Sequence, residues 1–452
     1  MIMQNTLYTN DNLFVLNGMN SESVDLIYLD PPFNSKRTYS APVGTKSAGA
    51  SFKDMWSWQD VDEAYLEKLA QDYPSLVEFI KSIQHNNSKA MMAYVTYVTQ
   101  RLIEMHRILK ETGLLYLHCD PTASHYLKIV LDKIFGRNNF RNEITWERTT
   151  DTGSSKAIAK FFPRNNDIIL FYSKSDQYYF NKIYNDYSES YIKNKFNEID
   201  EIGKYRWQVL KTYSDETLKK LKLENKVKIT ENSKYYYYKQ YLSESKGVRA
   251  SSLWKNDDIT PLGPNSSEST GYPTQKPLAL LERIIQASSQ EGDVVFDPFC
   301  GCATTCVAAQ RLGRKWIGID IEEKAAEVLI ERLSDDAGLF KDFTYINVFK
   351  NPNLNPQRTD VERIATTEKS VKERLFQQQN GHCNGCNINL DIWHFEVDHV
   401  VAKAKGGGDY FENYQLLCGS CNKIKGARPM EYLRLKIRTR RDLMEKEIEF
   451  GE

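Results

Sequence analysis

Two separate stretches of the chain carry alternating strand and helix patterns, and this arrangement restricts the fold most. In the first, residues 1–140, an apolar run at 24–29 is followed by apolar residues at helical spacing over 89–110. The second stretch covers 273–350 and repeats this alternation. Strands that alternate with helices form parallel sheets covered on both faces. We therefore predict an α/β fold with one doubly wound, Rossmann-like sheet built from both stretches.

The residues between these stretches, 141–272, have a different composition. Lysines are interleaved with tyrosines, and Lys174–Arg249 contains 16 Lys or Arg against 11 Asp or Glu. Basic side chains neutralise phosphates and aromatic rings stack on bases, which indicates a nucleic-acid contact. The alternative is a solvated insertion whose tyrosines pack on one another.

Composition excludes several classes of protein. The chain has 60 Lys or Arg and 60 Asp or Glu, so its global charge gives no argument for a nucleic-acid partner. No apolar run approaches the ~18 residues of a membrane-spanning helix. The first residues lack the basic and apolar regions of a secretion signal. We therefore expect no membrane association, no secretion and a cytoplasmic location.

The tetrapeptide Asp30-Pro31-Pro32-Phe33 directly follows the first predicted strand. This position is the carboxyl edge of a parallel sheet, where ligands bind. The exocyclic amine of a base is a weak nucleophile because its lone pair is delocalised into the ring. A carboxylate at Asp30 and a backbone carbonyl held by Pro31 and Pro32 could accept its hydrogens, and Phe33 could stack on an extruded base. Asp-Pro is also common in turns, so the motif alone is not specific.

A second motif follows the predicted strand at 294–296 and leads into a helix near 304–312. Small residues at such a turn let the backbone approach a ligand and direct amide groups at its carboxylate. Asp320 ends the next strand, where an acidic side chain typically binds ribose hydroxyls. We interpret Cys300, Cys302 and Cys306 as buried packing. The candidate ligand-contacting residues in this motif are Asp297, Pro298, Phe299, Gly301 and Thr304.

Together these motifs resemble the amino-methylating DNA methyltransferases of the β-class, whose catalytic motif precedes the cofactor motif. The resemblance covers most of 5–350 and implies S-adenosylmethionine as the methyl donor and double-stranded DNA as the substrate. It implies that Asp11 lies near the adenine of the cofactor, and that 273–277 opens the cofactor half. The target-recognition region of the family corresponds to 141–272. Cys302 departs from the family pattern, which usually has a second glycine there.

An aspartate at the start of the catalytic motif favours adenine N6 over cytosine N4, for which the family usually has serine. His118-Cys119-Asp120 also follows a predicted strand. We interpret His118 as structural, because no general base is needed if the amine loses its proton after methylation.

A small module, 370–452, follows a linker at 351–369. It contains two C-x-x-C pairs, and four thiolates in this arrangement are typical of a structural Zn²⁺ site. The four ligands predicted for zinc are Cys383, Cys386, Cys418 and Cys421.

The order Asp398-His399, Asn413, Asn422 between and beside these pairs resembles the HNH nucleases of the ββα-metal type. The resemblance implies that His399 is a general base whose ring Asn413 orients. Asp398 and Asn422 would bind a Mg²⁺-like ion. The lysines expected to contact phosphates are Lys403, Lys405, Lys423 and Lys425. The alternative is a zinc knuckle that binds DNA without cleaving it.

We therefore expect an S-adenosylmethionine-dependent adenine methyltransferase with a fused HNH module. One alternative is a single-chain restriction–modification nuclease in which methylation is secondary. Another is an N4-cytosine methyltransferase whose zinc module only binds DNA. A homodimer is left open by the sequence.

Overall fold

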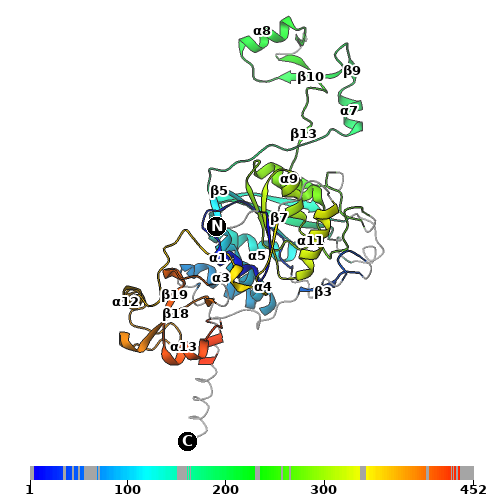
Figure 1. The fold of residues 1–452 in the computed structure, drawn as a ribbon. Helices are drawn as coiled ribbons and strands as arrows, with labels where there is room; N and C mark the ends of the chain where they lie inside the picture. Colours follow the sequence, from blue (N-terminus) through cyan, green and yellow to red (C-terminus); the bar gives the residue numbers. More distant parts are fainter. Residues whose placement is uncertain are drawn as a thin grey trace. The chain divides into compact units, whose positions relative to one another are not determined.

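The computed structural model describes most of the 452-residue chain. Residues Met1–Asn181 and Ser252–Glu452 form one compact unit, and Lys182–Ser251 form a second one (Figure 1). The described residues are 5–33, 37–42, 45–48, 51–54, 69, 72–149, 160, 162, 164–229, 235–255, 258–263, 266–335, 343–403, 407–428, 430, 432–433 and 436–437.

The larger unit is built on a nine-stranded sheet with the order β14-β6-β7-β5-β2-β15-β16-β1-β17. Strands β5, β2, β15, β16, β1 and β17 pair in parallel, whereas β7 is antiparallel to both β5 and β6. Strand β2 from the first stretch lies beside β15 from the second, which confirms the predicted single sheet. The strands are β1 (Thr6–Thr9), β2 (Val24–Leu29), β5 (Leu109–Cys119), β6 (Phe140–Glu147), β7 (Asn166–Ser173), β14 (Leu253–Trp254), β15 (Val294–Asp297), β16 (Lys315–Asp320) and β17 (Thr344–Asn347).

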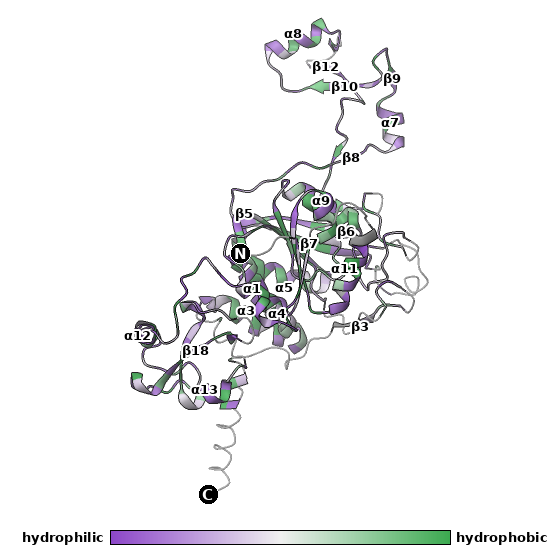
Figure 2. Cartoon of the chain, viewed as in Figure 1, coloured by the Kyte–Doolittle hydropathy of each residue, from purple (hydrophilic) through white to green (hydrophobic). Residues whose placement is uncertain are grey.

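Helices cover both faces of this sheet because successive strand residues point to opposite faces. In β2, Ile27 and Leu29 join one buried cluster, while Leu26 and Tyr28 join the other. Figure 2 shows hydrophobic residues concentrated in the sheet and in the helices beside it. The first cluster is covered by α1 (Asn12–Gly18), α3 (Pro74–Asn86), α4 (Lys89–Ile108) and α5 (Pro121–Leu131), and the second by α9 (Leu278–Ser288), α10 (Thr304–Arg311) and α11 (Glu323–Asp335).

The smaller unit has its own four-stranded sheet in the order β11-β12-β10-β9. Its first and last strands, β8 (Tyr184–Asn185) and β13 (Val248–Arg249), pair antiparallel. The predicted insertion, 141–272, is wider than this unit because the apolar strands β6 and β7 belong to the main sheet. The remaining elements are α7 (Glu189–Lys195), β9 (Glu198–Ile199), β10 (Lys204–Leu210), α8 (Asp215–Leu223), β11 (Val227–Ile229) and β12 (Tyr236–Tyr241).

The C-terminal module consists of α12 (Lys369–Gln378), the antiparallel strands β18 (Phe395–His399) and β19 (Tyr414–Cys418), and α13 (Gly419–Lys425). Strand, strand and helix follow one another in the predicted ββα order. The module has a separate apolar cluster that includes Val371, Phe395 and Leu416. The charged sequence near 430–449 predicts a further helix, and most of this segment lies outside the described residues. Among the helices that the structure describes, none has the length and apolar character that a membrane crossing requires.

Candidate active site

A pocket opens at the carboxyl ends of β2, β15 and β16 in the larger unit. Its lining brings together the loops after these strands, the start of α1 and the segment 272–276. All eleven residues predicted for the catalytic motif and the cofactor line it. Asp30 and Lys276, which are 246 positions apart in the chain, therefore share one cavity, because parallel strands end at the same edge of the sheet.

Lys276 contacts the Asp30 carboxylate in this pocket. Its ammonium group is hydrogen-bonded to Asp30 Oδ2 and also lies 5.4 Å from the centroid of the Phe33 ring. Both side chains of the ion pair are mostly buried, at 10% and 16% exposure. The sequence motif contained Lys276 but gave no reason to pair it with Asp30, because the contact depends on two distant loops.

The Asp297 side chain shapes the loop that leads into α10. Its carboxylate accepts hydrogen bonds from the Phe299 amide at 3.0 Å and from the Thr305 hydroxyl. Burial raises the pKa of Asp297 to about 7, although these two hydrogen bonds oppose the shift. Gly301 adopts φ +51° and approaches Tyr272 so closely that a Cβ would lie 3.0 Å from the ring. The loop therefore needs glycine at this position.

Asp320 joins this loop to the end of β16. Its carboxylate accepts hydrogen bonds from the Gly301 and Glu322 amides, both at 2.9 Å. Burial raises the pKa of Asp320 to about 6. Asp320 is thus held at the pocket wall by backbone amides from either side.

Asp11 caps the N-terminus of α1 and accepts a hydrogen bond from the Leu13 amide at 2.9 Å. The guanidinium of Arg101 donates to Asp11 at 2.9 Å and to Asn12 at 2.6 Å, and it lies 3.3 Å from the centroid of the Tyr97 ring. Arg101 is 2% exposed. The sequence signal for this contact is an arginine among the apolar residues of α4. We did not single out this arginine from the sequence.

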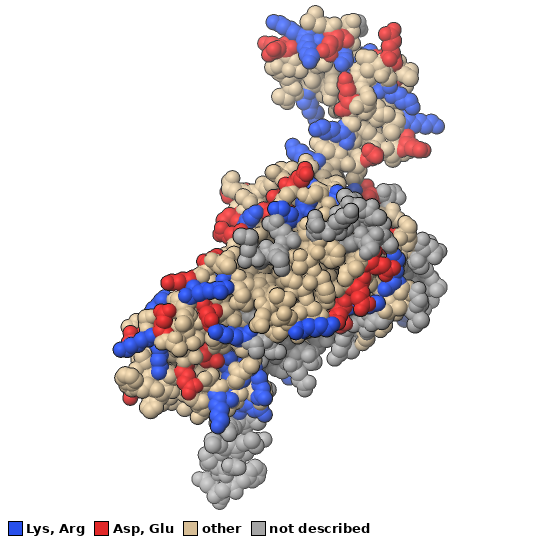
Figure 3. All heavy atoms as spheres, in the orientation of Figure 1, with Lys and Arg blue, Asp and Glu red and all other residues tan. Residues whose placement is uncertain are grey.

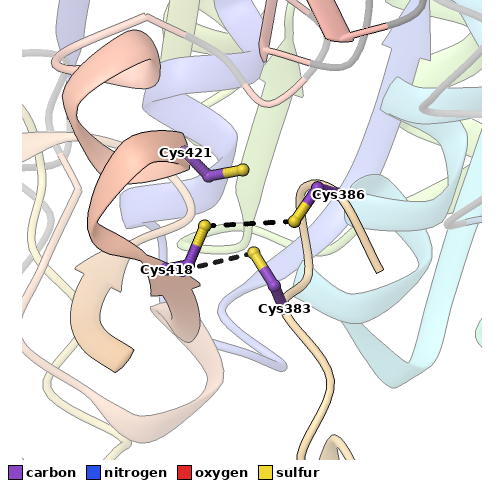
Figure 4. Close-up of side chains that lie close together, drawn as sticks. All are labelled: Cys383, Cys386, Cys418 and Cys421. Atoms are coloured by element: carbon purple, nitrogen blue, oxygen red, sulfur yellow. Dashed lines mark hydrogen bonds between the residues drawn. The ribbon is translucent and has the colours of Figure 1, made fainter. Parts of the chain in front are cut away.

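The four predicted zinc ligands converge in the C-terminal module. Their sulfur atoms all lie within 4.8 Å of one another, and Figure 4 shows the side chains pointing toward a common centre. The Cys386 and Cys418 sulfur atoms are 3.9 Å apart. A tetrahedral zinc with Zn–S bonds of about 2.3 Å requires sulfur separations of about 3.8 Å. The cluster therefore fits Zn²⁺.

His399 ends β18 and is oriented by Asp409. Its Nε2 lies 2.8 Å from Asp409 Oδ1, and its ring packs edge-on against Tyr414 at 5.0 Å between centroids. Lys403 also pairs with the Asp409 carboxylate, at 2.7 Å. Asp409 was not singled out from the sequence, since it belongs to no part of the HNH pattern.

Asn413 was expected to orient the His399 ring, but the structure gives its side chain a different role. The amide oxygen accepts a hydrogen bond from Val401 N at 2.9 Å, and the amide nitrogen donates to the carbonyls of Val401 and Gly408. Asn413 therefore holds the loop after β18. Asp409, in that same loop, holds the ring instead.

Asp398 and Asn422 were expected to share a divalent ion, but the structure gives them separate partners. Asp398 pairs with the fully buried Lys425 at 2.9 Å, while the Asn422 amide donates to Glu396. A carboxylate already neutralised by lysine is a poor ligand for a divalent cation. In this structure the two side chains therefore make separate contacts, and their binding of a Mg²⁺-like ion stays a prediction. Lys425 is also too buried to contact phosphate, and Lys405 lies outside the described residues.

Comparison with known proteins agrees with both parts of this architecture. Residues 24–331 match the DNA methylase family, and residues 383–428 match the HNH endonuclease family. The first match spans more than half of the chain, so the protein belongs to the DNA methylase family and carries a C-terminal HNH domain.

Two curated relatives align over most of this chain. It is 27% identical over 384 residues to the type II methyltransferase M.EcaI of Enterobacter cloacae, covering 78% of this chain and 75% of the relative. It is 24% identical over 328 residues to the DNA adenine methyltransferase YhdJ of Escherichia coli K12, covering 73% and 82%. Among solved structures, the PvuII cytosine-N4-specific DNA methyltransferase aligns with a TM-score of 0.41 and 13% identity, over 76% of this chain and 95% of that one.

Proposed function

We propose that this chain transfers a methyl group from S-adenosylmethionine to the N6 amine of adenine in double-stranded DNA. The observation that carries the proposal is the single pocket that holds Asp30 together with the predicted cofactor residues. The aspartate of the catalytic motif supports adenine as the target. The similarity to a relative named as a DNA adenine methyltransferase supports it as well.

S-Adenosylmethionine would supply an electrophilic methyl group on its sulfonium. The donor set of the pocket fits such a ligand, since the carboxylate of Asp320 suits ribose hydroxyls and the loop after β15 offers backbone amides to a carboxylate. Asp11 would lie near the adenine of the cofactor. Asp297 would keep the loop in shape through its hydrogen bonds to Phe299 and Thr305.

Asp30 would accept a hydrogen from the target amine and increase the electron density on its nitrogen. The Pro31-Pro32 pair restricts the backbone that carries this carboxylate, and Phe33 offers a ring for an extruded base. In the structure the ammonium group of Lys276 donates to Oδ2, one of the two carboxylate oxygens of Asp30. A target amine that approached this oxygen would take over a hydrogen bond that Lys276 makes in the free protein.

The smaller unit, Lys182–Ser251, would recognise the DNA sequence. Figure 3 shows Lys and Arg side chains distributed over it with acidic side chains among them. On its sheet Lys228 lies 3.9 Å from the centroid of the Trp207 ring, and Tyr235, directly before β12, is 60% exposed. Accessible aromatic rings beside lysines suit contacts to bases and phosphates.

Mapping modified bases in DNA from cells that express the chain tests this function directly. We expect N6-methyladenine within one short sequence, and its loss when Asp30→Ala is expressed at the same level. N4-methylcytosine would overturn the choice of base. Unmodified DNA in cells that contain folded, cofactor-binding protein would overturn the methyl transfer itself.

For the HNH domain we propose cleavage or nicking of DNA with His399 as the general base. The hydrogen bond from His399 to Asp409 supports this role, because a general base must be held in one orientation. The ion pair between Asp398 and Lys425 favours a second function, in which the zinc-bound module binds DNA without cleaving it.

Purified protein incubated with plasmid and Mg²⁺ or Mn²⁺ separates these two functions. Strand breaks that disappear in His399→Ala support the nuclease. Retention of plasmid without any break, on methylated and unmethylated DNA alike, supports the binding module. Repeating the reaction with S-adenosylmethionine distinguishes a restriction–modification protein, in which methylation and cutting compete for the same sites.

A further inference from the structure

His118 is buried at the carboxyl end of β5 and has a polar partner at each ring nitrogen. Its Nδ1 lies 2.9 Å from the Tyr28 hydroxyl, and its Nε2 lies 3.2 Å from Asp167 Oδ2. The other oxygen of Asp167 pairs with Arg148 Nε at 2.9 Å. Since β2, β5 and β7 are neighbours in the sheet, their pairing aligns these side chains in a row.

The direction of these hydrogen bonds follows from the charge on Asp167. Burial alone would raise the pKa of this carboxyl, but the hydrogen bond from His118 and the nearby Lys276 and Arg148 charges lower it below its ordinary value. An ionised carboxylate only accepts, so His118 donates from Nε2, and in the neutral ring Nδ1 is then the acceptor. Tyr28 must then donate its proton to Nδ1, which leaves its oxygen lone pairs free to accept.

The tyrosine of this row belongs to the lining of the pocket. Tyr28 lines the pocket together with Asp30, two residues further along the chain. The Phe33 ring, which also lines the pocket, packs on the His118 ring at 5.9 Å between centroids. On another side, His118 contacts Trp146 edge-on at 5.8 Å. One buried histidine therefore supports two residues of the proposed base site.

We propose that Tyr28, His118 and Asp167 form a relay that presents the Tyr28 oxygen to the target amine and takes up the proton lost after methylation. The inference rests on the methyl transfer proposed above. The amine carries two hydrogens, and Asp30 would accept one of them. The backbone carbonyl held by Pro31 and Pro32 would accept the second during transfer, and Tyr28 would receive its proton once the nitrogen has become cationic.

The proton transfer balances without a further reactant. After methylation the amine nitrogen is cationic, and breaking one N–H bond returns the electron pair to nitrogen. That proton passes to the Tyr28 oxygen while the Tyr28 hydroxyl proton passes to His118 Nδ1. His118 becomes an imidazolium next to the Asp167 carboxylate. The proton leaves by the same path once product is released. The charged groups that face the relay are Asp30, Asp297, Lys276, Asp167 and Arg148.

Tyr28→Phe and Asp167→Asn test the relay in the full-length chain. The first removes the accepting oxygen. The second removes the charge that fixes the His118 tautomer, so that Nδ1 carries the proton and donates to Tyr28. Tyr172→Phe is the matched control, because it also removes the hydroxyl of a buried tyrosine that has a side-chain partner, here the Asp132 carboxylate at 2.7 Å. This hydroxyl does not line the pocket.

Single-turnover methylation of a duplex that contains the mapped site gives the main readout. We expect both relay variants to lose about 10²-fold or more in rate, the usual contribution of a proton acceptor. Their affinities for S-adenosylmethionine and DNA should stay within about threefold of wild type, which separates a rate effect from a binding effect. Their rates should rise with pH as hydroxide replaces the relay. Tyr172→Phe should keep the wild-type rate. Wild-type rates in both relay variants would overturn the inference.

A second readout does not depend on methylation. In protein with ¹⁵N-labelled histidine, the His118 resonances should show a proton on Nε2, and Asp167→Asn should move it to Nδ1. A proton on Nδ1 in the wild-type chain would also overturn the relay. Failure of the proposed methyl transfer is distinguishable from failure of the relay, because the wild-type chain itself would then leave DNA unmodified.

Discussion

Lys276 and Asp30 form an ion pair within the candidate active site, although 246 positions separate them in the chain. The pair joins the catalytic motif after β2 to the segment that precedes α9. It therefore connects the two halves of the sheet at the place where substrate and cofactor would meet. A matching Lys–Asp pair, Lys110 with Asp25 at 2.8 Å, also involves β2 but lies outside the pocket lining.

Replacing Asp30 should remove methyl transfer and spare cofactor binding. We expect Asp30→Ala to lower the single-turnover rate by about 10³-fold or more, because it removes both positioning and electrostatic stabilisation of the amine. Lys276→Met should lower the rate by about tenfold to 10²-fold through misplacement of Asp30. Lys110→Met should leave the rate unchanged. Near-normal methylation by Asp30→Ala would contradict the assignment of the catalytic motif.

The stability of the free protein should depend on the protonation of Asp297. Its pKa is about 7 in the folded chain against an ordinary value of 3.8, so the folded state binds the proton more tightly than the unfolded state. The stabilisation is complete below about pH 4 and is lost as the pH rises toward 7. This single carboxyl can contribute ~4 kcal/mol at most.

Thermal unfolding between pH 4 and 8, in the absence of cofactor, measures this dependence. Asp297→Asn should flatten the decrease in Tm relative to wild type. Asp320→Asn should also reduce the decrease in Tm, but by a smaller amount. Its effect should end near pH 6, since the pKa of Asp320 is about 6. Parallel pH curves for wild type and Asp297→Asn would show that this carboxyl is not protonated in the folded state.

The full-length chain should contain one zinc ion, bound by the four converging cysteines. We expect Cys418→Ser to reduce the zinc content measured by mass spectrometry of the metal and to unfold the C-terminal module. The module is too small to rely on its apolar core alone. Cys119→Ala, at a buried cysteine outside the cluster, should keep its zinc. A zinc-free wild-type protein with a folded module would contradict this prediction.

The DNA cleavage proposed for the HNH domain depends on two neighbouring contacts at the end of β18, His399 with Asp409 and Asp398 with Lys425. His399→Ala should abolish strand cleavage and retain zinc, and Asp409→Asn should have a smaller effect because the imidazole remains. Lys425→Met frees the Asp398 carboxylate from its buried cation. If Asp398 binds a divalent ion during cleavage, this variant should cleave at a lower Mg²⁺ concentration than wild type. Unchanged metal dependence would place Asp398 in a structural role.

Local sequence signals were enough to predict the elements that carry the site. The predicted strand 24–29 and the predicted helix near 304–312 correspond to β2 and α10, because the residue pattern and the turn residues beside it mark each of them. The side-chain partners were not predictable in this way. Arg101 with Asp11 and Asp409 with His399 form only after distant segments pack together. His118 was interpreted as structural because methylation needs no general base, and its partner Asp167 lies 49 positions away on another strand.

The smaller unit should be separable from methyl-donor binding. Asn185 pairs with Val248 and Tyr184 with Arg249 at the base of this unit, so β8 and β13 can be closed by a two-residue turn. We therefore expect that replacing 186–247 with Asn-Gly, a sequence that suits a tight hairpin, leaves the main sheet folded. The shortened chain should bind S-adenosylmethionine with an affinity within about threefold of wild type, as expected when a DNA contact alone is lost.

The same shortened chain should lose site-specific methylation by about 10²-fold or more, together with most of its salt-dependent DNA affinity. Calorimetry with the cofactor and a filter-binding titration with the duplex separate the two effects. Asp30→Ala provides the opposite control, since it should keep DNA affinity and lose transfer. If the shortened chain methylates the same sequence at the wild-type rate, recognition must reside in the larger unit, and the basic, aromatic surface around Trp207 and Tyr235 would have no part in it.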